Sequence, residues 1–490
     1  MKKFFKYLFV TSLAITFISC EDEDLEQLPP GDAIYEYYFQ SPAEFESAIR
    51  GVYMSFFSSG FYTDYAGIVG VGDILADNVI TNPSGRGTLV FGYNWQYDSG
   101  YGAPTGIYSG AYQMITRANS ILANIDNIDD ADFPDKARIR AEALALRGFA
   151  HFEVAKNYVK IPTQSADANS FVGIPYVTEY DPYLEPAREA SVADVYTKII
   201  ADLEEALPNI PASAESKFRL NQNSMKGLMS RVYLFNGQYD KVIQYATPVV
   251  AAVAPAPKAN LKNLWRSNAD DGVLFEVLAS ASNVAIGINY SQGTGPTMVV
   301  EYAVDKAFFE LFDGVTEKER LEASVRLNTA INMYTVNRYM QSAISFGIHN
   351  GRYLRVEEVI LNLAEAQYLD PNTPQSAALT TLNILRDARY STYAGGETGD
   401  ALFDAIQLER RKELCFEGDR WYTLKRLQNV AGIPSHHTQG VVRSGNGQLA
   451  DGSGTTPLKL TLAPGAREWQ FPVTQTHLIR NSNMTQTPDY

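Results

Sequence analysis

The feature that most constrains the fold is a long stretch, residues 134–158, in which apolar side chains recur at helical spacing. Such spacing puts the apolar residues on one face of an α-helix, and that face must be buried against other elements. The apolar face comprises Ala141, Leu144, Ala145, Gly148, Phe149, Phe152 and Ala155. The same spacing recurs at residues 41–57, 106–125, 191–207, 224–250 and 354–390. The sequence therefore predicts a mostly α fold.

Two of these stretches divide into pairs of helices. Residues 224–236 and 239–250 are joined by a turn containing Gly237, and their small and large apolar residues resemble one tetratricopeptide unit. Residues 354–368 and 375–390 form a second pair. One such unit is not stable alone, and the two pairs are far apart in the sequence. We therefore expect a tetratricopeptide-like helical-repeat scaffold with insertions, not a regular solenoid.

Three long stretches lack helical spacing and are rich in Gly, Tyr, Asn and Ser. They lie near residues 58–108, 255–297 and 432–465. Loops of this length are uncommon inside a compact chain unless they carry function. We expect these loop-rich insertions to form a ligand-binding face.

The N-terminus has the plan of a secretory signal. Lys2, Lys3 and Lys6 precede an apolar run over residues 7–18, which is too short to span a membrane. Residues 17–20, Phe-Ile-Ser-Cys, resemble a bacterial lipobox with Phe in place of the commoner Leu. On this interpretation residues 1–19 are a lipoprotein signal peptide and Cys20 carries several acyl chains, which anchor a protein more firmly than one chain does. The alternative is an ordinary secretory signal with an incidental cysteine.

The four residues after Cys20 are all acidic. Because four carboxylates cannot pack into a core, we predict that residues 20–34 are an acidic lipidated tether and that residues 35–490 form the folded domain. An acidic run behind a lipidated cysteine also resembles the export signal that sends lipoproteins of Bacteroidota to the outer surface. The alternative is a linker that only adds solubility.

Charge and cysteine content exclude several classes of partner. The 490-residue chain has a net charge of −15, so it has no basic field that would attract nucleic acid or an anionic membrane face. Cys415 is the only cysteine besides Cys20, so we expect no intramolecular disulfide and interpret Cys415 as a small buried hydrophobe. After the signal, no apolar run approaches the length of a membrane helix.

Local motifs for catalysis are missing. The sequence has no HExxH, GxSxG or GxxxxGK[ST] motif, and no pair of carboxylates stands in a local pattern that singles it out for glycoside hydrolysis. His436 and His437 are adjacent, but no cysteine or carboxylate lies at ligand spacing from them, so we interpret them as surface histidines and predict no metal site. We predict a protein that is not an enzyme and has no cofactor; a structural calcium ion is left open.

Sugar binding suits the insertions better. Aromatic rings cover the C–H faces of pyranose rings with little loss of entropy, and amide, carboxylate and guanidinium groups bind the hydroxyls. The first two insertions are dense in both kinds of residue. The candidate ligand-binding residues are Trp95, Tyr97, Tyr101, Tyr65, Asn78, Trp265 and Tyr290, with Trp95 the first choice. The alternative for each aromatic residue is core packing, and Asp73 and Asp77, which stand at helical spacing, either cap a helix or pack against one.

A series of ordered motifs runs along the whole chain, from Cys20 and its acidic continuation to the tail at residues 488–490. Between these ends stand residues 45–53, 117–121, 140–150, 173–175, 409–421 and 471–473. This order and spacing resemble the SusD/RagB family, the nutrient-binding surface lipoproteins of Bacteroidota. In residues 409–420, arginines and glutamates alternate with apolar residues. Because arginine binds carboxylate through a planar fork, we expect this segment to be a partly buried lock between helices.

The resemblance implies a SusD-like scaffold and a function in nutrient capture. The protein would be anchored in the outer membrane, exposed at the cell surface, and would bind oligo- or polysaccharide for delivery to a SusC-like TonB-dependent transporter. Within the same family the alternative is capture of peptides, which a deep polar cavity would favour. From another class, the alternative is a tetratricopeptide-like scaffold or adaptor, which would need an exposed concave helical groove.

Overall fold

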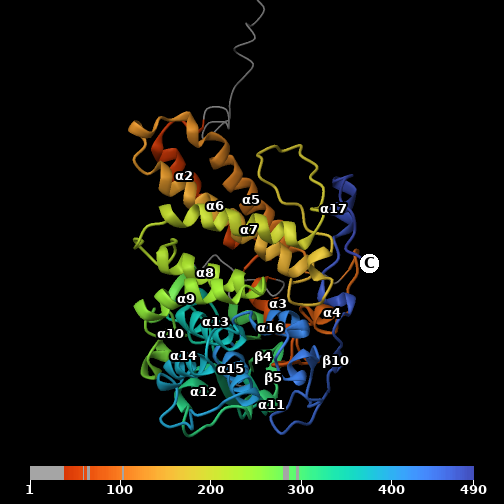
Figure 1. Cartoon of the computed structure of the whole chain (residues 1–490). Helices are drawn as coiled ribbons and strands as arrows, with labels where there is room; N and C mark the ends of the chain where they lie inside the picture. Colours follow the sequence, from red (N-terminus) through yellow and green to blue (C-terminus); the bar gives the residue numbers. More distant parts are fainter. Residues whose placement is uncertain (1–37, 59, 63–66, 102–103, 280–285, 294–296) are drawn as a thin grey trace, which may run out of the picture.

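The computed structural model describes residues 38–58, 60–62, 67–101, 104–279, 286–293 and 297–490. The predicted signal peptide, the whole of the predicted tether with Cys20, and Tyr65 lie outside these residues. The described chain is mostly helical, and its helices stack in two groups along an elongated body (Figure 1). The first group comprises α2 (Pro42–Tyr53), α5 (Gly106–Asn124), α6 (Lys136–Tyr158) and α7 (Val192–Ala206). None of the helices in the described part of the chain has both the length and the hydropathy of a membrane span.

Local sequence explains where the first helix begins. The Glu44 carboxylate accepts hydrogen bonds from the backbone N–H groups of Gln40 at 2.7 Å and of Ser41 at 2.8 Å. Pro42 occupies the first turn, where its missing N–H leaves no helical bond unmade. The last turn of the predicted helix is the 3-10 segment Met54–Phe57.

The helix α6 confirms the predicted 134–158 helix but is buried more completely than one apolar face requires. Every residue from Ala141 to Tyr158 is buried, since α2, α5 and α7 pack around the helix. Its charged residues are paired: Glu142 with Arg219 at 2.8 Å and Arg147 with Asp202 at 2.7 Å. These ion pairs satisfy charges that burial would otherwise make costly.

The two predicted helix pairs are observed and lie side by side. The first pair is α8 (Gln222–Phe235) and α9 (Tyr239–Ala252), and Gly237 between them has a φ of 72°, which glycine adopts without steric cost. The second pair is α13 (Val356–Leu369) and α14 (Gln375–Asp387). Because α13 packs against α8, α9 and α14, sequence-distant units share one core. The tetratricopeptide-like scaffold is confirmed.

Five short antiparallel strand pairs are found in the described residues, and some of them join segments that are distant in the sequence. They are β1 (Val79–Thr81) with β5 (Tyr302–Val304), β2 (Val273–Val277) with β8 (Gly351–Arg355), β3 (Ser291–Gln292) with β4 (Val299–Val300), β6 (Val325–Asn328) with β7 (Met333–Val336), and β9 (Val441–Val442) with β10 (Thr461–Leu462). The β1–β5 pair joins the first insertion to the segment that follows the second. The first insertion is therefore docked on the chain that follows the second insertion.

The first insertion is more ordered than its sequence predicts. It contains α3 (Ile68–Ile74) and α4 (Val90–Tyr93), and every residue of α3 is buried. Further short helices are α10 (Leu261–Leu264), α11 (Lys306–Phe309), α12 (Lys318–Ser324), α16 (Arg420–Arg426) and α17 (Gln475–Arg480). Elements of one or two turns are too short to produce a periodic pattern in the sequence.

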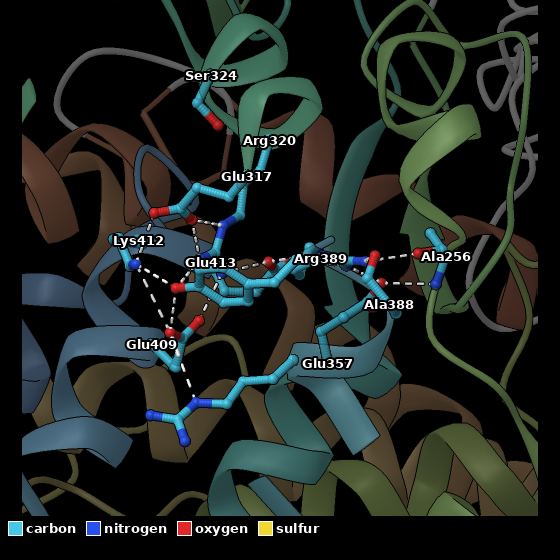
Figure 2. Close-up of polar contacts among 12 residues, drawn as sticks. Ala256, Glu317, Arg320, Ser324, Glu357, Ala388, Arg389, Glu409, Lys412 and Glu413 are labelled. Carbon is cyan, nitrogen blue, oxygen red and sulfur yellow. Dashed lines mark hydrogen bonds and ion pairs between the residues drawn. The ribbon is translucent and has the colours of Figure 1, made fainter. Parts of the chain in front are cut away.

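The predicted lock around residues 409–420 is confirmed as a buried network of ion pairs (Figure 2). Glu413, near the end of α15 (Asp400–Glu413), lies 2.7 Å from Arg389 Nε and 3.1 Å from Arg355 Nη1. Arg389 also pairs with Glu357 at 2.8 Å. The network joins α13, α15, the end of β8 and Arg389, which lies two residues beyond the end of α14, so it holds the second helix group together. Cys415, within the same segment, is buried as expected.

Candidate functional site

An exposed pair of aromatic rings marks the candidate site. Phe91 in α4 is 39% exposed and Tyr101 is 59% exposed, and their ring centroids lie 4.5 Å apart in an edge-to-face arrangement. The turn before Tyr101 is fixed by hydrogen bonds from the Asp98 N–H to the Tyr101 carbonyl at 2.9 Å and from the Gly100 N–H to Asp98 Oδ1 at 2.8 Å. A predicted ligand residue, Tyr101, is therefore held at the surface by its neighbours.

Beside this pair is an open hollow of about 420 Å³, which we call the Tyr101 hollow. It lies between the Tyr101 turn, the start of α5 and α17. Its lining includes Asp98, Ser99, Tyr101, Thr105, Ser109, His477 and Arg480. The Gln475 N–H donates to the Ser99 carbonyl at 3.0 Å, which holds α17 against the turn. The hollow thus combines an aromatic ring with hydroxyl, carboxylate, imidazole and guanidinium groups.

The surroundings of the imidazole in the Tyr101 hollow favour its neutral form. Burial lowers the pKa of His477, and the positive charge of Arg480 lowers it further. The ring packs on Tyr108 with centroids 4.6 Å apart, and its Nδ1 lies 2.6 Å from the Thr474 hydroxyl. His477 can therefore hydrogen-bond to a neutral ligand without adding a second positive charge beside Arg480.

Trp95 and Tyr97, which the sequence places in the ligand site, lie in the interior. Trp95 is 1% exposed, and its Nε1–H donates to the Leu75 carbonyl at 3.0 Å. Tyr97 is also buried, with its hydroxyl donating to the Glu468 carbonyl and its ring against Phe471. Neither ring presents a face to solvent. The prediction that these two rings contact ligand is corrected, because distant segments of the chain cover both of them.

Three other candidates are also buried. Trp265 packs against Tyr339, and Tyr290 packs against Phe416 at 5.6 Å between ring centroids. The side-chain oxygen of Asn78 accepts a hydrogen bond from Arg411 Nε at 2.8 Å. These residues support the fold at the places where the sequence predicts ligand contact. Of the predicted set that the structure describes, Tyr101 is the member with an exposed ring.

Asp73 and Asp77 pack against helices and do not cap one. Asp73 Oδ2 accepts a hydrogen bond from the Gly418 N–H at 2.6 Å, and Asp77 binds Arg420 with two bonds of 2.8 Å. Burial raises the pKa of Asp73 to about 7. Burial has the same tendency at Asp77, but Arg411 and Arg420 outweigh it and hold the pKa of that carboxyl well below its usual range. Both carboxyls anchor α3 and the residues after it to the segment around α16.

His436 and His437 differ from the isolated surface histidines that the sequence suggests. Each Nε2 lies 2.8 Å from Oδ1 of Asp404 in α15. The carboxylate that local spacing does not provide comes from a helix far upstream in the sequence.

Sequence reasoning missed most of the Tyr101 hollow. Its lining residues Thr105, Ser109, His477 and Arg480, and Phe91 beside it, belong to separate elements that meet only in the fold. The one usable signal is Tyr101, an aromatic residue in a turn rich in Gly, Ser and Asp. Exposure of a ring depends on what covers it, and that is a tertiary property.

Two family models match the chain. The first, described as starch-binding and associating with the outer membrane, matches residues 61–234. The second, described as the SusD family, matches residues 319–490. Together the matches include α5, α6 and α7 of the first helix group, the Tyr101 turn, the buried network around Glu413 and α17.

Individual relatives agree over most of the chain. The SusD-like protein P2 of Formosa agariphila is 25% identical over 543 residues, with 100% of both chains covered. A putative sugar binding protein from Bacteroides vulgatus has a TM-score of 0.76 at 21% identity, covering 92% of this chain and 99% of its own. Surface glycan-binding protein A from Bacteroides fluxus has a TM-score of 0.72 at 16% identity, covering 91% and 99%. At these identities the solved structures establish the shared fold.

Proposed function

The chain belongs to the SusD/RagB family, and from this premise we propose that it binds oligo- or polysaccharide at the cell surface and delivers it to a TonB-dependent transporter of the SusC type. The family model describes starch binding and association with the outer membrane. The observation that carries the proposal is the exposed Phe91–Tyr101 pair beside the polar Tyr101 hollow. The interaction is binding without turnover.

The chemistry of the Tyr101 hollow suits a sugar. The Tyr101 ring offers a flat apolar face for the C–H side of a pyranose, and its edge contact with Phe91 keeps the ring orientation fixed. Asp98 supplies acceptors for sugar hydroxyls, Arg480 supplies donors, and the hydroxyls of Thr105 and Ser109 supply both. An open hollow of this size accommodates a short stretch of a chain that continues beyond it on either side.

The alternatives are less well supported. A peptide-capturing protein needs a deep polar cavity, but the pocket beside Arg231, Glu358 and Arg410 has a volume of about 40 Å³, enough only for a few water molecules. An adaptor needs an exposed helical groove, whereas α13 is buried continuously from Val356 to Ala366. Both observations favour the shallow surface site.

Delivery to a transporter requires attachment to the membrane. We propose that Cys20 carries the lipid anchor and that the acidic residues behind it form the tether, with the folded domain outside the cell. The net charge of −15 supports a protein partner over a direct contact with anionic lipid, because like charges repel.

Affinity electrophoresis through gels containing a panel of polysaccharides tests the proposal. We expect one polysaccharide to retard the wild-type protein and Tyr101→Ala to abolish most of that retardation. Tyr183→Ala is the matched control because Tyr183 is 91% exposed and lies outside the hollow. Equal retardation of the wild type and Tyr101→Ala would show that the ligand does not bind in the Tyr101 hollow. No retardation by any polysaccharide would favour the peptide alternative.

A further inference from the structure

A compact group of metal-binding side chains lies outside the Tyr101 hollow. Asp404 on α15 and the neighbouring His436 and His437, in the 3-10 segment Ser435–Thr438, form what we call the His–Asp cluster. Their potential ligand atoms all lie within 4.8 Å of one another. Both imidazole Nε2 atoms converge on the same carboxylate oxygen, each at 2.8 Å.

The surrounding fold holds this cluster in place. The His437 ring packs against Phe403, which is buried and in turn contacts Tyr368 of α13. The 3-10 turn is closed by hydrogen bonds from the His437 N–H to the Pro434 carbonyl at 3.0 Å and from the Thr438 hydroxyl to the Ser435 carbonyl at 2.9 Å. His437 is therefore fixed, and a metal ion would meet a site that is already assembled.

The other two ligands can adjust and leave room for water. The side chains of His436 and Asp404 are 57% and 45% exposed, whereas that of His437 is 16% exposed. In a tetrahedral zinc site the bonds of about 2.0–2.1 Å place neighbouring ligand atoms roughly 3.3 Å apart. Each imidazole Nε2 lies 2.8 Å from the Asp404 oxygen, so small shifts of Asp404 and His436 would bring these atoms to that spacing. A water molecule would complete the coordination from the solvent side.

We propose that Asp404, His436 and His437 bind one divalent transition-metal ion of the zinc class. Two neutral imidazole nitrogens and one carboxylate oxygen are ligands that Zn²⁺ accepts, and three protein ligands with one open position form a recurrent set. Ca²⁺ and Mg²⁺ prefer oxygen ligands throughout, so two imidazoles select against them.

The bound ion would fasten the third insertion to the helical scaffold. His436 and His437 stand near the start of residues 432–465, and Asp404 is on a scaffold helix whose end carries Glu413. Further along the same insertion, Ser444 donates to Asp305 at 2.6 Å and Arg443 donates to the Tyr93 carbonyl at 2.8 Å. The metal would attach the start of the third insertion to α15, whereas the bonds of Arg443 and Ser444 hold its middle.

The test is a zinc titration of the full-length chain, purified without a polyhistidine tag, in competition with a chromophoric chelator. We expect one Zn²⁺ per wild-type chain. Asp404→Asn replaces an anionic ligand with a neutral amide, and His436→Ala removes an imidazole ligand. Each should weaken binding by about tenfold or more, at least the loss that follows a change in an outer-shell partner. His477→Ala is the matched control, because His477 is also partly exposed but belongs to α17. It should bind zinc as the wild type does.

Co²⁺ absorption and thermal unfolding provide a second readout. Bound Co²⁺ should give the visible bands of a four-coordinate site in the wild type and in His477→Ala. Zn²⁺ should raise the unfolding temperature in these two proteins but not in Asp404→Asn. Equal zinc affinity in all four proteins would place the ion elsewhere and overturn the proposal. Absence of micromolar binding by folded wild type would overturn it as well.

Discussion

The guanidinium carbon of Arg443 lies 4.1 Å from the centroid of the Trp95 ring, although the two residues are separated by most of the chain. The same guanidinium lies 3.8 Å from the Tyr93 ring and donates hydrogen bonds to the carbonyls of Ala76 and Tyr93 at 3.0 and 2.8 Å. Arg443 of the third insertion thus packs its guanidinium against the rings of Tyr93 and Trp95 in the first insertion. This contact explains why Trp95, an apparent ligand residue, is a packing residue.

Trp95→Ala should therefore act on stability. Removing a buried tryptophan leaves a cavity and exposes the stacked cation, so we expect the free energy of unfolding to fall by about 3–5 kcal/mol. Chemical denaturation measures the loss, with Tyr183→Ala as a control that changes it little because Tyr183 is exposed. If Trp95→Ala left stability unchanged but weakened glycan binding, the ring would have to reach the ligand after all.

The ionised Glu365 carboxylate should stabilise the folded protein at neutral pH, and this stabilisation should be lost at acidic pH. Burial raises the pKa of this carboxyl, but Arg426 and Arg410 lower it more strongly, to about 2 from an ordinary 4.5. Because the folded-state pKa is depressed, the contribution is complete above about pH 4.5 and is lost as the pH falls towards 2. A shift of this size corresponds to roughly 3 kcal/mol.

Denaturation of Glu365→Gln across pH 2–7 measures this contribution. The variant should be less stable than the wild type at pH 7, and the difference in unfolding free energy should shrink as the pH falls. Glu310→Gln is the control, since Glu310 pairs with Lys306 near the surface, where ion pairs contribute little. A difference that stays constant with pH would show that Arg426 does not stabilise the charged form of Glu365.

Asp73 should have the opposite pH dependence. Burial raises its pKa to about 7 from an ordinary 3.8, so between these values the folded protein holds a proton that the unfolded chain has released. The carboxyl therefore lowers stability progressively as the pH rises from about 4 to 7, by up to about 4 kcal/mol. Asp73→Asn should abolish this pH-dependent loss of stability. The unfolding free energy of the variant should therefore rise relative to that of the wild type as the pH rises.

Asp77→Asn is the matched comparison for that experiment. Arg411 and Arg420 overcome the effect of burial and depress the pKa of Asp77, so its contribution is lost at low pH and retained at neutral pH. The unfolding free energy of Asp77→Asn should therefore become lower than that of the wild type as the pH rises through the acid range. Parallel pH profiles for the two variants would contradict the assigned environments.

The sequence predicts the scaffold better than the site for a physical reason. The helices α6, α8, α9 and α13 are long enough for several apolar turns, so their periodicity survives whatever packs on them. By contrast, α4 has four residues and gives no periodic signal. Exposure of Tyr101 and burial of Trp95 depend on Arg443 and α17, which come from the other end of the chain. Asp404 of the His–Asp cluster is also too far from His436 and His437 in the sequence for a local motif to reveal it.

Two helical glycines offer a last test of how closely α3 packs against the buried lock. A Cβ added to Gly72 would lie 2.1 Å from the carbonyl oxygen of Gly418, which is backbone and cannot rotate away. Gly72→Ala should therefore push α3 off the segment that Asp73 anchors and lower the free energy of unfolding by about 1–3 kcal/mol or more. A Cβ at Gly51 in α2 meets nothing within 4 Å, so Gly51→Ala should instead raise it by about 0.5–1 kcal/mol through helix propensity. Thermal and chemical denaturation of the two variants should give shifts of opposite sign, and a neutral Gly72→Ala would mean that α3 can separate from Gly418 at no cost.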